Sequence, residues 1–434
     1  MTGRVIITYG RSLMALTAAH SLGTRGIEVI GCDDVDMTVM NFSRYVEDYF
    51  IHAPYHEKPE RYLDDLEKHI RRFKPEDNRP YILMPMFRDA AILAAHRERF
   101  EELITLAIPD ITSMNRVHPK DILARTCEEL ELCSPKTILI QDLEELEVHK
   151  DTLEFPLLIK PADAVGGAGI HKVRDYTELQ KLCAESYKRY GTLPLIQEIV
   201  EGKDYCLAAL CDQGEIVAHM AYRNLHQFPR DFGAGVMRET IDDSPFLDTS
   251  KKLLKALNWN GVVQIDFRWS GEEKDPAYLI EVNPRFWAGL FHSVESGIDF
   301  PWLLYQLFAE GSVKDSCDAI IGAKTKIPGL WTLSALQDIA ESEIQFEKLK
   351  RAWQQTWDSS KHENWQKRFQ GLTDALRDCI DGKDMIEKVK DLHKAGKAVK
   401  SEFTAKDDPF IGLGFLFIAS SLLRHGELPP EIKR

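Results

Sequence analysis

The sequence predicts a protein of mixed α/β and α+β class, built from three consecutive parts. In residues 1–115, strand-like runs alternate with helical runs, a pattern that predicts a parallel sheet. In residues 116–311, strand-like runs follow one another directly, which predicts antiparallel sheets. Residues 312–434 show the period of amphipathic helices and many charged side chains. A chain of 434 residues is long enough for several domains with substantial cores.

The first part opens with a β-α-β pattern. An apolar strand at 4–8 is followed by a helical run at 12–26 and a second strand at 28–34. The same alternation returns in segments 81–86, 89–100 and 104–109. These segments together predict one α/β domain with a parallel sheet.

A dehydrogenase can begin in the same way, with Asp33 or Asp34 holding the ribose of a nicotinamide cofactor. The first turn of this chain reads YGRS, with one glycine where the dinucleotide fingerprint has three. Without the other glycines, the backbone cannot approach a pyrophosphate closely. An NAD-binding dehydrogenase is therefore the remote alternative.

The second part begins with a helix in HPKDILARTCEELEL, from residue 118. Its strand signals are PKTILI, FPLLIKP, IHKVR and LPLIQEIV, with the helix YTELQKLCAESYKRY between the last two. CLAALC and EIVAHMAYR predict a hairpin around residues 212–214. A long helix, FLDTSKKLLKALNW, then leads to the strands VVQIDFRW and AYLIEVN.

The third part is predicted to be helical, with tryptophans and leucines at the spacing of packed helix faces. Near its end, the apolar run IGLGFLFIASSLL at 411–423 is shorter than the roughly 20 residues that a membrane-spanning helix needs. We expect a buried helix there and no membrane span.

Charge and cysteine content limit the function classes. The net charge of −14 argues against a general nucleic-acid binder, although a local basic pocket stays open. The eight cysteines lack zinc-type spacing, and Cys206 and Cys211 fall in predicted strands. The start MTGRVIITYGRS lacks the pattern of a signal peptide. We expect reduced thiols and a cytoplasmic location.

Two neighbouring strand-like runs carry polar side chains on one face. In VVQIDFRW the polar face includes Gln264 and Asp266, and in AYLIEVN the alternation puts Leu279, Glu281 and Asn283 on one side. The connector SGEEKDP at 270–276 has the composition of a hairpin turn. Such a hairpin would bring Asp266 near Glu281 and Asn283. An ordinary solvated sheet face would show the same alternation.

A close pair of carboxylates implies a cation. Two ionised carboxylates at contact distance disfavour each other unless one is protonated or a cation joins them. Two carboxylates and an amide offer the oxygen ligands that suit Mg²⁺, which keeps waters and phosphate oxygens as its other ligands. The hairpin therefore predicts a Mg²⁺ site at Asp266, Glu281 and Asn283, which Mn²⁺ could also occupy.

A glycine-rich loop follows a strand-end lysine in FPLLIKPADAVGGAGIHKV. Lys160 ends the apolar strand, and Gly166, Gly167 and Gly169 lie in the loop after it. Such a loop can present backbone N–H groups to a phosphate without a side chain in the way. A surface hairpin would look the same, but the lysine favours phosphate binding.

A third element is LIQEIVEGKDY, at 195–205. The backbone around Glu198 and Val200 could read an adenine edge, and Asp204 could accept hydrogen bonds from ribose hydroxyls. Taken alone, this stretch is a connector between domains.

Taken in order, these elements resemble the ATP-grasp superfamily. The matching motifs are Lys120 in HPKD, Lys160 followed by GGAG, the QEIVEGKD linker, Asp266 in QIDF, and EVNPRF with Glu281 and Asn283. The subgroup most similar to this chain is the carboxylate–amine ligases related to the carbamoyl-phosphate-synthase type. FTAKDDPF at 403–410 is also similar to a tail of that subgroup.

The resemblance implies an arrangement of domains and a set of roles. Residues 1–115 would be the α/β domain that precedes the nucleotide fold, 116–311 the two-lobed ATP-grasp domain with a lid subdomain at about 120–195, and 312–434 a helical extension. By this resemblance, Lys120, Lys160 and the 166–169 lid loop would contact the phosphates. Gln197, Glu198 and Val200 would line an adenine pocket, and Asp204 would bind the ribose. Asp266, Glu281 and Asn283 would bind the metal, and Arg285 would stabilise the transferring phosphoryl group.

Three residues have less definite predictions. Arg223 occupies roughly the place of a phosphate-contacting basic residue, and a surface position on a strand is equally consistent with the sequence. Arg11, just after the first strand, is a candidate anchor for a substrate carboxylate, or a surface residue at a helix start. Some ligases of the superfamily have an arginine two residues before the first metal carboxylate, where this chain has Gln264.

The implied reaction is ATP-dependent ligation. A carboxylate would be activated as an acyl-phosphate by Mg·ATP and then joined to an amine or a similar nucleophile. The residues leave open a kinase that stops at phosphoryl transfer and a non-catalytic ATP-binding module. The expected partners are small-molecule carboxylate and amine substrates, with no nucleic acid, and a homodimer stays open.

Overall fold

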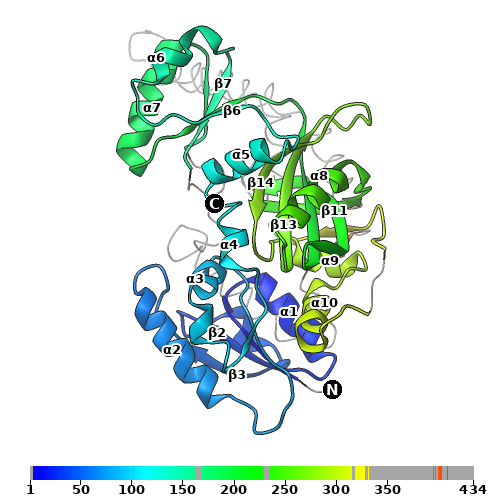
Figure 1. Cartoon of the computed structure of the whole chain (residues 1–434). Coiled ribbons are helices and arrows are strands. Elements are labelled where there is room, and N and C mark those ends of the chain that lie inside the picture. Colours follow the sequence, from blue (N-terminus) through cyan, green and yellow to red (C-terminus); the bar gives the residue numbers. More distant parts are fainter. Residues whose placement is uncertain are drawn as a thin grey trace, which may run out of the picture. The chain divides into compact units, whose positions relative to one another are not determined.

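The computed structural model describes residues 3–162, 169–228, 234–314 and 318–327, together with 331, 394, 396, 399–402 and 408. The described residues fall into two compact units, one with residues up to 224, 238–323 and 408, the other with 225–237 and residues from 324 to 402. Figure 1 shows the chain coloured along its sequence. The segment 411–423 and most of the charged helices predicted after residue 340 lie outside the described residues. The domain boundaries at 115 and 311 stay predictions.

The N-terminal sheet is parallel, as predicted. Its strands are β1 (Arg4–Ile7), β2 (Glu28–Asp33), β3 (Val46–Ile51), β4 (Tyr81–Met84) and β5 (Thr105–Leu106), in the order β3-β2-β1-β4-β5. Every pairing in it is parallel, so all the strands end at one edge. The helices of this region are α1 (Leu13–Gly23), α2 (Pro59–Arg72), α3 (Asp89–Ala95) and α4 (Ile111–Met114), with short 3-10 turns at Val39–Phe42 and Arg97–Arg99.

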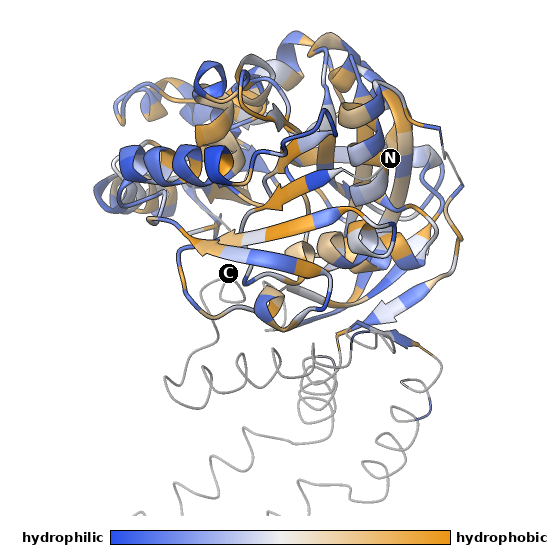
Figure 2. Ribbon diagram, turned by 90° about the horizontal axis from the view of Figure 1, so that it is seen from below, coloured by the Kyte–Doolittle hydropathy of each residue, from blue (hydrophilic) through white to orange (hydrophobic). Residues whose placement is uncertain are grey.

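Both faces of this sheet are buried, because its helices cover opposite sides. Ile6, Ile30 and Leu83 pack with the apolar stripe of α2, and Leu66 of α2 is fully buried. Alternate strand residues, such as Val5, pack instead with α1. The strands are accordingly mostly hydrophobic, while the helices mix both kinds of residue along their length (Figure 2). Burial of one leucine stabilises the fold by about 2 kcal/mol.

A smaller antiparallel sheet follows. Its strands are β6 (Thr137–Ile138), β7 (Leu157–Lys160), β8 (His171–Val173) and β9 (Leu195–Glu198), in the order β6-β9-β7-β8. Helix α5 (Lys120–Glu129) precedes it, α6 (Leu146–His149) and a 3-10 turn (Lys150–Thr152) follow β6, and α7 (Tyr176–Tyr190) covers it. Helix α7 has the predicted bounds because Asp175 caps its start and Gly191, in the left-handed region, ends it.

The large sheet carries the hairpin with the acidic residues. Its strands that lie wholly or partly in the first unit are β10 (Lys203–Asp212), β11 (Glu215–Phe228), β12 (Ala234–Ile241), β13 (Gly261–Trp269) and β14 (Tyr278–Asn283), in the order β14-β13-β10-β11-β12. One face packs on α8 (Ser244–Ala256), and the other packs on residues of α9 (Leu290–Glu295) and α10 (Phe300–Glu310). Cys206 and Cys211 lie in β10, as predicted.

The second unit contains two strands where the sequence predicted only helices. Strands β15 (Lys324–Lys326) and β16 (Lys400–Ser401) pair in parallel, and the Ile327 N–H donates to the Val236 carbonyl at 2.8 Å. The prediction of an all-helical region from 312 onward is therefore wrong for these segments. Strands this short leave no alternating pattern to read.

Among the described residues, no helix is long and apolar enough to cross a membrane. The described cysteines are free thiols, and Cys32, Cys127, Cys183, Cys206 and Cys211 are buried.

Candidate active site

The predicted hairpin is formed by β13 and β14, and it places the two carboxylates opposite each other. Asp266 pairs directly with Glu281 across the antiparallel ladder, and Gln264 pairs with Asn283. Directly opposite residues of such a ladder have neighbouring side chains. The sequence therefore predicted this juxtaposition correctly.

The predicted alternation along β14 is only partly right. The pairing register shifts between Asp266 and Phe267, so that Phe267 pairs with Leu279 and Ile280 forms a bulge. Leu279 is consequently buried with Phe267 in the core, away from the polar face where it was predicted beside Glu281. The bulge leaves Glu281 and Asn283 paired with Asp266 and Gln264, while Leu279 and Val282 stay in the core.

Hydrogen bonds connect the polar residues of the hairpin. Asn283 Nδ2 donates to Asp266 Oδ2 at 3.3 Å, and Gln264 Nε2 donates to Asp266 Oδ1 at 3.0 Å. Arg285, which follows Pro284 at the end of β14, donates from Nη2 to Asn283 Oδ1 at 3.0 Å and from Nη1 to the Phe286 carbonyl at 2.9 Å. Arg285 is only 8% exposed, so these contacts hold its guanidinium against the hairpin.

The electrostatics of the hairpin fit a cation. Burial, and then the negative charge of Glu281, raise the pKa of Asp266 to about 7. A divalent ion would relieve both effects, because it replaces lost hydration and separates the two anions. The donor set of two carboxylates and one amide oxygen suits Mg²⁺. Among the described residues, no group of three or more His, Cys, Asp or Glu side chains is positioned to hold a metal ion.

Lys120 reaches this hairpin from the start of α5. Its ammonium lies 3.3 Å from Glu281 Oε1, and its side chain is 17% exposed. The Lys120 backbone N–H donates to the Ala162 carbonyl at 3.2 Å, just beyond the end of β7. The structure thus brings Lys120 to the carboxylates, as the predicted role in phosphate binding requires.

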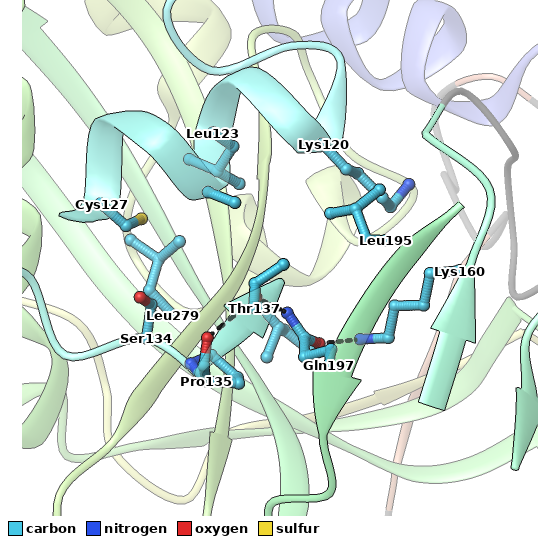
Figure 3. A pocket seen from close by; sticks show the side chains of 12 residues that line it. Lys120, Leu123, Cys127, Ser134, Pro135, Thr137, Lys160, Leu195, Gln197 and Leu279 are labelled. Carbon is cyan, nitrogen blue, oxygen red and sulfur yellow. Dashed lines mark hydrogen bonds between the residues drawn. The ribbon is translucent and has the colours of Figure 1, made fainter. Parts of the chain in front are cut away.

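Lys160 projects from the end of β7 toward β9. Its Nζ donates to Gln197 Oε1 at 2.5 Å, and Gln197 Nε2 donates to Thr137 Oγ1 at 2.8 Å (Figure 3). Burial, and then the positive charge of Lys120, lower the pKa of Lys160 to about 8. Lys120 and Lys160 line the same pocket.

A pocket lies beside these lysines. Lys120, Lys160 and Gln197 stand at its polar side, and Figure 3 shows Leu123, Cys127 and Leu279 along the rest of its wall. An apolar wall with amide and hydroxyl groups suits a flat heterocycle with polar edges. Sequence reasoning missed the lining residues Leu123, Ser134, Thr137, Leu195 and Leu279, because they come from four separate helices and strands and one connecting segment.

The remaining predicted nucleotide contacts have mixed support. Glu198 uses its backbone N–H for the Lys136 carbonyl at 3.0 Å, so this donor is already engaged within the sheet. Val200 lies two residues beyond the end of β9. Asp204 shares the sheet face of Asp266 and forms an ion pair with Arg268 at 2.7 Å. The roles of these three residues stay predictions.

Of the predicted phosphate loop, only Gly169 is described, and Gly166 and Gly167 lie outside the described residues. Gly169 has a φ of 74°, in the left-handed region that favours glycine. A Cβ atom there would lie 2.5 Å from the Tyr190 hydroxyl and 2.8 Å from Pro161 Cγ. Both the left-handed backbone conformation and the close contacts that a Cβ would make favour glycine at this position.

Two predicted arginines lie elsewhere. Arg223 pairs in register with Tyr205, which pairs with Phe267, so it belongs to the opposite sheet face from Asp266. Its guanidinium binds Glu239 at 2.6 Å. This placement argues against a phosphate contact. Arg11 forms ion pairs with Asp33 and Asp34 of its own chain, so a role as substrate anchor would require it to leave them.

Comparisons with known proteins agree with this geometry. Residues 123–289 match the family model of the ATP-grasp domain. The carbamoyl phosphate synthase large chain of Clostridium beijerinckii is 25% identical over 230 residues, which cover 51% of this chain and 21% of that protein. The chain thus spans about a fifth of the length of the curated relatives it matches.

Solved structures share the fold. The biotin carboxylase domain of the Hydrogenobacter thermophilus 2-oxoglutarate carboxylase, in complex with MgADP and bicarbonate, aligns with a TM-score of 0.57 and 17% identity, over 74% of this chain and 73% of that chain. The L-amino acid ligase from Bacillus licheniformis aligns with a TM-score of 0.54 and 18% identity, over 72% of this chain and 77% of that chain.

Proposed function

We propose that this chain, which carries an ATP-grasp domain, is an ATP-dependent ligase. It activates a carboxylate as an acyl-phosphate with Mg·ATP and joins it to an amine or a similar nucleophile, releasing ADP and phosphate. One observation carries the proposal: the paired carboxylates Asp266 and Glu281 lie beside Lys120, next to a pocket that also contains Lys160. Anionic ligands for a metal and cationic groups for phosphates are the two requirements of phosphoryl transfer.

Asp266, Glu281 and Asn283 would hold the metal ion, Mg²⁺ or Mn²⁺. When bound, that ion supplies positive charge to the phosphate oxygens of the nucleotide. The complex of a structural neighbour with MgADP supports this assignment.

The nucleotide would lie along the pocket with its phosphates toward the lysines. Lys120 and Lys160 neutralise the phosphates, and the 166–169 loop covers them. Gln197, Glu198 and Val200 line the adenine side, and Asp204 holds the ribose. Glu198 would act through its carbonyl or its second carboxylate oxygen, because its N–H and Oε1 are both hydrogen-bonded to the Lys136 backbone.

Arg285 would stabilise the negative charge that develops on the transferring phosphoryl group. Its contacts with Asn283 and the Phe286 carbonyl orient the guanidinium before substrate arrives, which is where preorganised charge has its largest effect. The names of two similar proteins, a carbamoyl phosphate synthase and an L-amino acid ligase, support amide-type bond formation through an activated acid. As part of this proposal we place the protein in the cytoplasm, where ATP is supplied, and a homodimer stays open.

The test is release of ADP and phosphate from Mg·ATP, measured over a panel of carboxylates crossed with amines and with hydroxylamine. Hydroxylamine captures an acyl-phosphate as a hydroxamate, so a hydroxamate that forms only with ATP and one acid supports the ligase. A stable phosphorylated product without any amine requirement identifies a kinase instead. If ATP binds but no acid of the panel causes release of ADP, a non-catalytic ATP-binding module is favoured.

A further inference from the structure

The aromatic ring of Phe87 contacts the guanidinium of Arg285, the residue that follows the hairpin. The Arg285 guanidinium carbon lies 4.8 Å from the centroid of the Phe87 ring. An arginine within about 6 Å of an aromatic face is attracted by the electrons of the ring, and the attraction is larger when water is excluded from the arginine. Arg285 is buried, so the contact with Phe87 contributes to the orientation of its guanidinium.

Phe87 in turn stacks on Tyr9. The two ring centroids lie 4.6 Å apart, and the interplanar angle is 7°. The rings come from neighbouring parts of the N-terminal sheet, because Tyr9 follows β1, Phe87 follows β4, and these two strands pair in parallel. Tyr9 and Phe87 thus form an aromatic pair, in which each ring restricts the rotation of the other.

The backbone fixes the positions of both aromatic residues. The Met86 N–H donates to Thr8 Oγ1 at 3.2 Å, and each of these residues directly precedes one of the rings. Tyr9 has a φ of 58°, in the left-handed region that is uncommon for a residue with a side chain, and its carbonyl accepts the Ser12 N–H at 3.0 Å. Such a conformation persists where the surrounding structure determines it, and it is frequent at functional sites.

Phe87 differs from the hydrogen-bond partners of Arg285 in its distance along the chain. Asn283 Oδ1 and the Phe286 carbonyl accept hydrogen bonds from the guanidinium at 3.0 and 2.9 Å, and both residues lie within two positions of Arg285. These two bonds fix the guanidinium relative to the end of β14. The contact with Phe87 fixes it relative to the N-terminal sheet, which lies outside the residues 123–289 that match the ATP-grasp family model.

We propose that Phe87 is a positioning residue for phosphoryl transfer. Its ring, stacked on Tyr9, holds the Arg285 guanidinium in the orientation that stabilises the transferring phosphoryl group. This inference rests on the proposed function and adds a residue of the N-terminal region to it. Phe87 acts through Arg285 and not on the nucleotide. Its removal should therefore lower kcat and leave the KM for ATP unchanged, because the oriented charge acts in the transition state.

Variants of Phe87 separate the aromatic contact from apolar packing. Phe87→Leu keeps an apolar side chain without an aromatic face, so we expect kcat for ADP release to fall roughly tenfold at an unchanged KM for ATP. Phe87→Tyr keeps the ring and should have a kcat close to that of the wild-type protein. Phe308→Leu, at a half-buried phenylalanine of α10, is the matched control and should keep both constants.

Fluorination of the Phe87 ring tests the electrostatic part of the contact with little change in size. Phenylalanines with one, two and three ring fluorines withdraw electrons from the ring face to an increasing degree, and kcat should decrease in that order. This series leaves the packing almost unchanged, so it tests the proposal even if Phe87→Leu fails to fold.

A spectroscopic signature tests the orientation of Arg285 without turnover. The Nε–H resonance of Arg285 is assigned by its absence in Arg285→Lys, and the ring current of Phe87 shifts it in the wild-type protein. With Mg·ADP bound, this resonance should move in Phe87→Leu and stay in place in Phe308→Leu.

The outcomes separate this inference from the proposed function. A wild-type kcat in Phe87→Leu, a kcat that does not depend on ring fluorination, or an Arg285 resonance that stays in place overturns the positioning role. If an acid and an amine still cause ADP release, the ligase stands without that role. If the resonance moves but no acid causes ADP release by the wild-type protein, the orientation of Arg285 by Phe87 stands and the ligase fails.

Discussion

The Lys120 ammonium lies 3.3 Å from Oε1 of Glu281, the residue directly across the hairpin from Asp266. A lysine therefore stands where the proposed metal ion would bind its second carboxylate. In this arrangement Lys120 and the ion compete for Glu281, and the nucleotide phosphates offer the lysine a new partner.

Removal of this competition should strengthen metal binding in the absence of nucleotide. We expect Lys120→Met to bind Mn²⁺ several-fold tighter than the wild-type protein, while the affinity for Mg·ADP falls because a phosphate contact is lost. The Mn²⁺ affinity is obtained from the free Mn²⁺ measured by electron paramagnetic resonance, and the Mg·ADP affinity is obtained by calorimetry. Lys251→Met, on the exposed side of α8, is the control. Unchanged Mn²⁺ affinity in Lys120→Met would count against the competition.

Neutralisation of Glu281 should abolish turnover and leave the fold intact. Glu281→Gln keeps the shape of the side chain but removes one anion of the metal pair, so we expect the rate of ADP release to fall by roughly 100-fold or more. The thermal melting temperature should stay within a few degrees, because Glu281 is partly exposed. Glu60→Gln, an exposed change in α2, should keep full activity. Near-normal turnover by Glu281→Gln means that the metal assignment is wrong.

Nucleotide binding should weaken as the pH rises above about 8. Lys160 has a pKa of about 8 because it is buried and lies near Lys120, so in the free protein it loses its charge above that pH. A bound polyanion favours the charged form, and Mg·ADP binding near pH 8.5 should therefore take up a proton. Calorimetry in two buffers of different ionisation enthalpy measures this uptake. Lys160→Met should lose both the affinity and the uptake, whereas Lys188→Met, exposed on α7, should keep them. Uptake that persists in Lys160→Met assigns the proton to another group.

Two glycines allow backbone strain to be separated from a steric clash. Gly169 and Gly191 have φ values of 74° and 73°, but a Cβ at Gly191 meets nothing within 4 Å, while one at Gly169 meets Tyr190 and Pro161. Gly191→Ala should cost about 1 kcal/mol of stability for the left-handed conformation alone. Gly169→Ala should cost more and should also raise the KM for ATP. Thermal unfolding and steady-state kinetics of the two variants test this prediction. Equal losses of stability and equal KM values for the two variants would show that the clash at Gly169 has no effect.

A buried histidine should make the fold sensitive to acid. Burial, and then the charge of Arg238, lower the pKa of His292 to about 3, and its Nε2 lies 3.0 Å from Thr240 Oγ1. Because the unfolded chain binds a proton near pH 6.5 and the folded one does not, His292 destabilises the fold as the pH falls from about 6 toward 3. The expected slope is about 1.4 kcal/mol per pH unit. Denaturant unfolding of His292→Gln against pH should show a smaller slope, and His56→Gln, at an exposed position, should keep the wild-type slope.

The regular parts of the fold could be predicted because their patterns are long. The helix at 176–190 has a clear period, a capping aspartate and a terminal glycine, and its bounds were predicted to the residue. The strands β1, β2 and β4 were predicted from continuous apolar runs, as expected for a sheet buried on both faces. Strand β3 and helix α2 were missed, because VEDYFI contains two adjacent acidic residues and buries only Phe50, and α2 carries its apolar residues among many charges.

The site was predictable where it depends on local pairing and unpredictable where it depends on tertiary packing. Asp266 and Glu281 meet because one short connector joins their strands. The bulge at Ile280 depends on a single extra residue, which alternation alone does not reveal. Thr137 and Leu123 line the pocket through the packing of separate elements, and Arg223 falls on the other sheet face because of a register that only the structure provides.

The hydrogen bond from the Lys120 backbone to Ala162 has a consequence for how the length of this chain can vary. This hydrogen bond attaches the start of α5 to Ala162, two residues after Lys160. The backbone positions of Lys120 and Lys160 are therefore fixed relative to each other by a short segment. An insertion or deletion of a single residue between 160 and 162 would displace one ammonium relative to the other by about 3.3 Å. We therefore expect viable length variants in the exposed segment 74–78 and none between 160 and 162.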